Sequence, residues 1–170
     1  MSKIIEVKGI NPTIPESCFL AEGSIITGDV VMGKDCSIWF NAVIRGDVCE
    51  IRLGNKVNIQ DMCMIHGTIG RSKTIIGNNS SIGHRAIIHG AIIEENVLIG
   101  MGAVVMDNAI IKSGALVAAG AVVLENQILE GGYIYAGVPA KKIKKLDTEQ
   151  QQFHILRTSD AYIKYSSWYK

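Results

Sequence analysis

Three of the four histidines in this 170-residue chain lie close together in the sequence, at His66, His84 and His89. Three neutral imidazoles around a divalent ion with an open fourth position make a catalytic zinc site, in which the pKa of a bound water falls to about 7. The fourth histidine, His154, lies far along the chain, and we expect no chemistry from it. The sequence therefore predicts a metal site with zinc as the expected ion, although iron and cobalt also accept imidazole ligands.

The segments that must position these histidines carry a repeat of six residues. Large aliphatic residues recur at this spacing, and a small residue follows most of them four positions later, as Ala109 follows Val105. A helix would space its apolar residues by three and four, and a simple strand would alternate at two. A coil with three short, flat sides explains both the period and the size difference, because successive coils stack as parallel strands around an aliphatic core. Residues 10 to 138 then give roughly seven turns of 18 residues.

The six-residue step fails at three places, and the histidines lie at two of them. The step is nine residues from Ile44 to Leu53, eleven from Ile65 to Ile76, and five from Ile88 to Ile93. Sequences tend to break their own pattern at functional or strained sites. The first break holds Arg45, Gly46 and Asp47, the second begins with His66, and the third begins with His89.

The repeat also predicts how the histidines are placed. His66 and His84 are 18 residues apart, so we expect them to stack on adjacent rungs of one side. Each histidine follows an inward aliphatic residue by one or two positions and should face outward near a corner. Outward side chains of one prism do not converge on one point, whereas two subunits packed side by side bring such side chains together. Three subunits close into a trimer with one site at each interface.

Polar residues near the breaks predict an outer shell for the site. Arg45 and Asp47 point the same way from an extended segment and can form a charge-assisted pair at the interface. Gln60 points outward beside the inward Ile59 and can hydrogen-bond a metal-bound water. Asp61 can orient a histidine or an arginine, as residues behind metal ligands commonly do.

Composition excludes several classes of function. The net charge is +1, and no basic stripe marks a nucleic-acid surface. The longest apolar run, residues 115 to 124, is far shorter than the roughly 20 residues of a membrane span. Residues 1 to 8 have no secretory apolar stretch, and the four cysteines show no C-x-x-C spacing, which favours a cytoplasmic protein. Cys36 and Cys63 take small core positions of the repeat.

The sequence predicts one repeat domain followed by a helix. Residues 1–146 form the β-helix, and the Gly137-Val138-Pro139 segment ends the repeat. Residues 147–170 form a helix packed on the same domain. Asp147 or Thr148 can cap its first turn, and Gln150 or Gln151 is then the glutamine of a capping box, which bonds back to the capping residue. Phe153, Leu156 and Ile163 are expected on the buried side of this helix.

Several motifs resemble the γ-class carbonic anhydrase family, which belongs to the hexapeptide-repeat superfamily. The resemblance covers nearly the whole chain, and the histidine spacing is its specific part. The matching segments are Ile44-Arg45-Gly46-Asp47, Asn58-Ile59-Gln60-Asp61, Ile65-His66-Gly67, Ile82-Gly83-His84, Ile88-His89-Gly90, Ile99-Gly100-Met101-Gly102-Ala103 and Ala136-Gly137-Val138-Pro139-Ala140.

The resemblance implies an all-β, left-handed parallel β-helix with a C-terminal α-helix, assembled as a homotrimer. It implies a metal held by His66 and His89 of one subunit and by His84 of its neighbour. Arg45 and Asp47 would stabilise the interface, Gln60 would lie beside the metal-bound water, and Tyr162 matches a tyrosine that relatives bring near the metal. The implied activity is reversible hydration of CO2, with CO2 and bicarbonate as the small-molecule partners.

Two departures from the family keep other functions open. Efficient members carry acidic proton-shuttle residues directly after the Arg-Gly-Asp segment and on an acidic loop, where this chain has Val48 and a short basic link at residues 70–73. The alternatives are metal-dependent hydrolysis of an acyl-CoA thioester, acyl transfer with one histidine as base and no metal, and a trimeric scaffold with a closed structural metal site. Three clustered histidines argue against the acyltransferase.

Overall fold

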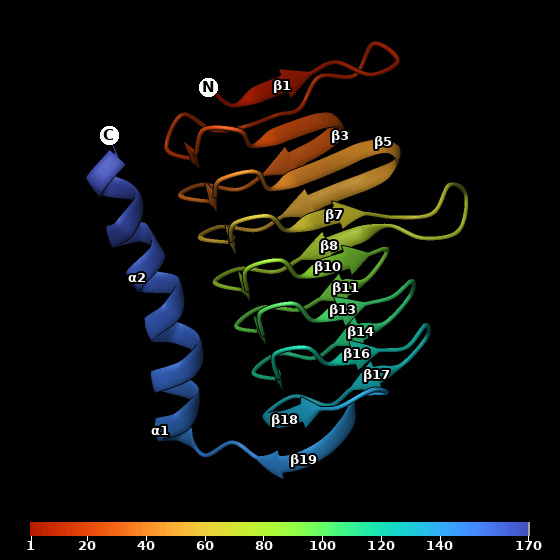
Figure 1. Ribbon diagram of the computed structural model, residues 1–170, viewed down its shortest axis with the longest axis vertical. Helices are drawn as coiled ribbons and strands as arrows, with labels where there is room; N and C mark the ends of the chain where they lie inside the picture. Colours follow the sequence, from red (N-terminus) through yellow and green to blue (C-terminus); the bar gives the residue numbers. More distant parts are fainter. Residues whose placement is uncertain (170) are drawn as a thin grey trace.

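The computed structural model describes residues 1–169, and within this range it leaves the side chain of Gln152 undescribed. The chain forms a stack of coils with one long helical segment alongside it (Figure 1). Each coil has three short sides, and each side pairs in parallel with the sides above and below it. This arrangement confirms the β-helix that the six-residue repeat predicts, with about seven turns. Lys170, the last residue of the predicted helix, lies outside the described residues.

The first side of each coil forms the helix-covered face. Its strands, in order along the stack, are β2 (Phe19–Leu20), β4 (Ser37–Ile38), β6 (Asn58–Ile59), β9 (Ser81–Ile82), β12 (Leu98–Ile99), β15 (Leu116–Val117) and β18 (Tyr133–Ala136). The lysine-rich β19 (Lys141–Lys145) pairs antiparallel with β18 and ends the stack.

The other two sides are joined by two long strands, β3 (Ile25–Met32) and β5 (Val43–Leu53), which run around a corner. The first half of β5 continues into the histidine face, made of β7 (Met64–His66), β10 (Ile87–His89), β13 (Val104–Val105) and β16 (Val122–Val123). The second half continues into the third face, made of β8 (Thr74–Ile76), β11 (Ile92–Ile93), β14 (Ile110–Ile111) and β17 (Ile128–Leu129). Strand β1 (Lys3–Ile5) pairs with β3 at the start of the stack.

Glycine makes the corner within β3 and β5. Gly28 has a φ of +69°, and a Cβ there would overlap the backbone of Gly46 in the next coil. A Cβ on Gly46 would in turn meet the backbone of Asp29. Two backbones therefore stack at this corner without side chains between them. The pairing then shifts from Gly28–Gly46 to Val30–Ile51, so residues 47–50 of β5 lie opposite Asp29 alone, which explains the nine-residue step between Ile44 and Leu53.

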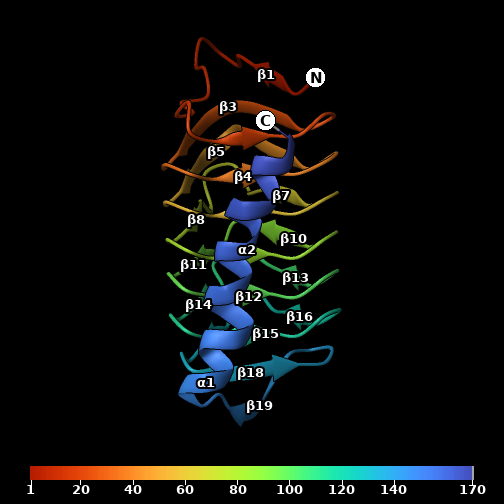
Figure 2. The same cartoon turned by 90° about the vertical axis from the view of Figure 1, so that its left-hand side faces the viewer.

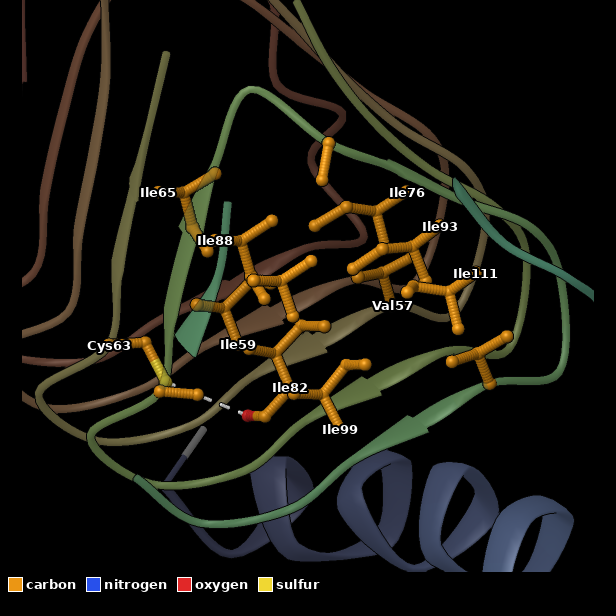
Figure 3. Close-up of a cluster of buried hydrophobic side chains, with 14 of the residues drawn as sticks. Val57, Ile59, Cys63, Ile65, Ile76, Ile82, Ile88, Ile93, Ile99 and Ile111 are labelled. Carbon is orange, nitrogen blue, oxygen red and sulfur yellow. Dashed lines mark hydrogen bonds between the residues drawn. The ribbon is translucent and has the colours of Figure 1, made fainter. Parts of the chain in front are cut away.

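The core is the predicted ladder of aliphatic residues. The inward isoleucines Ile59, Ile82 and Ile99 lie directly above one another and are fully buried (Figure 3). The small positions are equally buried, including Cys36 and Cys63 at 1% exposure, so both are core residues as predicted. None of the four cysteines forms a disulfide.

The C-terminal segment packs along the helix-covered face (Figure 2). It consists of α1 (Thr148–Gln151), a wider π-helical turn η1 (Gln152–Leu156), α2 (Arg157–Ser166) and a final 3₁₀ turn η2 (Ser167–Tyr169). Asp147 caps it, because its Oδ1 accepts a hydrogen bond of 2.7 Å from the Gln150 amide while Gln150 Oε1 accepts one from the Asp147 amide. No helix among residues 1–169 is long and apolar enough to cross a membrane.

One prediction for this helix is wrong. Phe153 is 56% exposed, whereas the neighbouring Ile155 is buried. The π-helical turn contains both residues and holds more residues per turn than an α-helix, so a 3.6-residue periodicity assigns the wrong side chain to the covered face.

We expect the ladder to carry most of the stability. Ile111→Ala should lower the free energy of unfolding by about 2–5 kcal/mol, because it leaves a cavity in a fully buried column. Ile69→Ala is the matched control, since Ile69 is 67% exposed and should change stability by less than about 0.5 kcal/mol. Urea denaturation at fixed protein concentration measures both, and equal losses would contradict the account.

Candidate metal centre

Two of the three predicted ligands meet at one end of the histidine face. His66 ends β7, His89 ends β10, and the two residues are direct partners in the parallel pairing. Nδ1 of His66 lies 3.3 Å from Nε2 of His89. The two ring nitrogens therefore face the same small space.

A carboxylate holds the other nitrogen of each ring. Nε2 of His66 lies 3.1 Å from Oδ1 of Asp47, and Nδ1 of His89 lies 3.1 Å from Oδ2 of Asp107. A carboxylate fixes the N–H of an imidazole on the side that faces it. The lone pairs of both rings then point into the space between His66 and His89.

Arg45 and Asp47 surround His66. Their side chains form an ion pair of 2.6 Å, and Arg45 Nη2 approaches Nδ1 of His66 to 3.3 Å. Burial opposes ionisation of Asp47, but hydrogen bonds from Arg45 and His66 outweigh it and lower the pKa of the carboxyl group. Burial also lowers the pKa of His66, which favours the neutral imidazole that a metal requires.

Asp107 is a candidate site residue that the sequence prediction missed. Its carboxylate accepts hydrogen bonds from Ser72 and from Thr68 Oγ1 (3.1 Å) as well as contacting His89. Burial opposes its ionisation, but the Ser72 and His89 contacts outweigh burial and lower the pKa. Residues 67–73 form the protruding link between β7 and β8 in Figure 1. Through Thr68 and Ser72, this link is hydrogen-bonded to the carboxylate that contacts His89.

His84 lies at a different corner. It follows β9 and precedes β10, so it stands at the opposite end of β10 from His89. Its Nδ1 lies 2.7 Å from Oδ2 of Asp61, and its Nε2 lies 3.2 Å from the Tyr162 hydroxyl on α2. Burial raises the pKa of Tyr162 to about 12, so the phenol stays protonated at neutral pH.

Gln60 lies in the coil before His84 and is hydrogen-bonded to its backbone. Its Oε1 accepts a hydrogen bond of 3.1 Å from the His84 amide, and its Nε2 donates one of 3.0 Å to Asn58. Asn58 in turn donates to Ser81 at 2.7 Å. These side chains point away from the coil as predicted, but they are buried because they lie on the helix-covered face.

The predicted stacking of His66 on His84 is wrong. His66 pairs with His89, 23 residues later, and the Arg85 amide bonds the carbonyl of Asp61, which places His84 above Asp61. The reason is the link of residues 67–73, which lengthens that coil beyond the regular 18 residues. The coil spacing of the regular region therefore does not apply across the second break.

Within one chain, His84 does not join the other two histidines. Among residues 1–169 no three histidine, cysteine or acidic side chains gather in a way that would hold a metal. The donors present nonetheless fit an ion such as zinc. A tetrahedral ion with bonds of about 2.0–2.1 Å holds its ligand nitrogens roughly 3.3–3.4 Å apart, which matches the observed 3.3 Å. All three histidines also have the carboxylate partner that metal-binding histidines typically have.

Comparison with known proteins decides the family. A carbonic anhydrase from Geobacillus kaustophilus is 43% identical over 98% of this chain and 91% of its own length. The mitochondrial gamma carbonic anhydrase 2 of Arabidopsis thaliana is 36% identical over 90% of this chain, which spans 56% of that longer protein. The chain belongs to the γ-class carbonic anhydrase family.

Two further comparisons place this γ-class protein among hexapeptide-repeat proteins. The family model for the bacterial transferase hexapeptide (six repeats) matches residues 90–125. The crystal structure of a hexapeptide transferase family protein from Anaplasma phagocytophilum is 34% identical and superposes with a TM-score of 0.94, over 99% of this chain and 98% of that one. The fold alone is therefore shared with proteins named as transferases.

We expect the Asp107 carboxylate to increase the affinity of His89 for a metal ion. Asp107→Asn keeps the shape but removes the charge behind the ring, so zinc affinity should fall roughly 10- to 100-fold. Asp35→Asn is the control, because Asp35 lies exposed on a distant corner. Competition titration against a zinc chelator measures the affinity, and an unchanged value for Asp107→Asn would show that this carboxylate only anchors the link.

Proposed function

We propose that this protein catalyses the reversible hydration of CO2 at a metal ion held between subunits of a trimer. The observation that carries the proposal is the pair of carboxylate-backed imidazoles, His66 and His89, whose facing nitrogens lie 3.3 Å apart. A third carboxylate-backed imidazole, His84, precedes β10 at the end opposite His89. Its Nε2, which contacts the Tyr162 hydroxyl of the same chain, would be the nitrogen that reaches a neighbour's ion.

His66 and His89 of one subunit and His84 of the next would hold the ion. A divalent metal with this nitrogen donor set, zinc first and iron or cobalt as alternatives, supplies a Lewis acid that makes water nucleophilic at neutral pH. Asp47, Asp61 and Asp107 hold the ring nitrogens that face away from the ion.

The remaining polar residues would orient the substrates. The Gln60 carboxamide is fixed by Asn58 and by the His84 backbone, so its second N–H can donate to water or bicarbonate beside His84. The protonated Tyr162 hydroxyl is a second donor in the same place. Arg45 places a positive charge next to His66, where the bicarbonate anion would leave.

Exposed apolar residues favour association at the corner that carries His84. Met62 and Met101 flank this corner and are 60% and 58% exposed, and Ile87 of β10 is 40% exposed. Apolar side chains gathered on one surface usually mark a contact with another protein. A second copy of the chain covering this corner would bury these side chains and bring its own His66 and His89 to His84. The trimer is the closed form of such a repeated contact.

The absence of disulfides fits a reducing compartment, so we place the protein in the cytoplasm. The acids that efficient family members use as proton shuttles are replaced by Val48 and by the basic link of residues 70–73. We therefore expect proton transfer to solvent, and not the hydration step, to limit turnover.

A second candidate is hydrolysis of a small acyl thioester at the same metal. A cleft of about 340 Å³ lies between α2 and the helix-covered face, and it reaches Gln60, His84 and Tyr162. Leu98, Met101 and Leu116 give it an apolar wall that suits an acyl chain. The same water nucleophile would then attack a carbonyl carbon in place of CO2.

Subunit complementation tests the interface site. His84→Ala and His89→Ala chains should each lose the metal and the exchange of oxygen between CO2 and bicarbonate. Mixed trimers regain an intact site wherever a His84→Ala chain supplies His66 and His89 to a His89→Ala neighbour, so about a quarter of the sites should recover in a random equal mixture.

The controls separate the possible outcomes. Mixing His66→Ala with His89→Ala chains should restore nothing, because both substitutions damage the same half of each site. Recovery in that control, or none in the first mixture, would contradict a site shared between subunits. Metal binding with hydrolysis of short acyl-CoA and no CO2 exchange would replace the first candidate by the second.

A further inference from the structure

A small pocket with aromatic walls lies between the end of α2 and the turn that follows β4. Its volume is about 220 Å³. Six of its lining residues are aromatic: Trp39, Phe40, Tyr162, Tyr165, Trp168 and Tyr169. The other two are Asp61 and His84. Aromatic residues are only 6% of the chain, so the concentration of six around one pocket needs an explanation.

The rings hold one another in place. Trp39 meets Tyr162 edge to face with ring centres 5.2 Å apart, and Phe40 meets Tyr169 in the same manner at 5.6 Å. Trp39 is buried at 5% exposure and forms the floor, whereas Trp168 is 65% exposed and stands at the rim. The pocket is therefore a preformed cup with an open mouth.

The electrostatics of this cup favour a cation. The faces of aromatic rings carry negative potential. The Asp61 carboxylate, whose Oδ2 contacts Nδ1 of the neighbouring His84 at 2.7 Å, adds a formal negative charge to the wall. No lysine or arginine lines the pocket. The chain places its own cations over other rings, with Lys142 4.2 Å from the Tyr133 ring centre and Arg157 4.9 Å from that of Phe153. Within residues 1–169, no such cation is recorded over the rings of the pocket.

We propose that this aromatic pocket binds the head group of a small quaternary ammonium compound. A trimethylammonium group spreads its charge over methyl groups that pack against rings, and it is weakly hydrated, so it needs no hydrogen-bond acceptor. The volume lies below the roughly 300–1,000 Å³ of pockets for drug-sized ligands, which suits a head group and not a whole cofactor. The pocket shares Asp61, His84 and Tyr162 with the candidate metal centre, and the proposed ligand goes beyond CO2 hydration.

Intrinsic fluorescence provides a direct probe, because the only two tryptophans of the chain, Trp39 and Trp168, both line the pocket. Titration of the full-length protein, as purified with its metal, with choline should change the emission saturably. The uncharged isostere 3,3-dimethyl-1-butanol should bind roughly five- to thirtyfold more weakly, since it has the same shape but no cation–π attraction. Equal affinities would overturn the proposal and leave a merely apolar cup.

Two substitutions in the C-terminal helical segment provide a second test of choline binding. Trp168→Leu keeps an apolar rim but removes a ring, so the affinity for choline should fall at least severalfold, with Trp39 as the remaining reporter. Phe153→Leu is the matched control, because Phe153 is an exposed aromatic residue of the same helical segment outside this pocket. Equal effects of the two substitutions, or no saturable binding of choline to the unaltered protein, would also overturn the proposal.

Discussion

The register between successive coils decides which side chains meet in this molecule. Parallel pairing places each residue above one partner in the coil before it, and the buried ladder of isoleucines prevents slippage, because a shift by one residue would turn the core outward. Chemistry is therefore confined to corners and to places where a coil is longer or shorter than 18 residues. The link of residues 67–73 is such a place, and it is the reason that His66 lies beside His89.

The pairing register also brings a carboxylate to each of the three histidines. Asp47, Asp61 and Asp107 come from corners of three different coils, and each reaches a nitrogen of a histidine in an adjacent coil. A carboxylate at this position fixes the tautomer and increases the basicity of the opposite nitrogen. With the outer nitrogens held by carboxylates, the facing nitrogens of His66 and His89 lie 3.3 Å apart, which is a separation that two ligands of one cation can have. The pairing of each histidine with an acid thus connects the geometry of the coil to metal chemistry.

Much of this could be read from the sequence, and the failures have physical causes. The period of six identified the coil and its inward core residues, because the inward side chains recur at fixed positions within the hexad. It did not identify the side chains that the C-terminal segment buries on the outside of the coil, such as Trp39 and Gln60. The motifs also named the three histidines, Gln60, Asp61 and Tyr162, which the structure groups as one pair and one separate cluster. The stacking of His66 and His84 was mispredicted because a link of unknown path changes the register for every later residue. Asp107 was missed because it interrupts no hexad, and Phe153 was misassigned because a π-helical turn leaves no signature in the spacing of apolar residues.

The separation of His84 from His66 and His89 makes one claim central: a complete site requires two chains. Anomalous X-ray diffraction from crystals of the zinc-loaded protein tests it most directly. We predict one strong zinc peak per subunit, bonded by His66 and His89 of one chain and by His84 of a neighbour, with a solvent position open. A peak ligated by residues of a single chain, or one that leaves His84 bound only to Asp61 and Tyr162, would contradict the account.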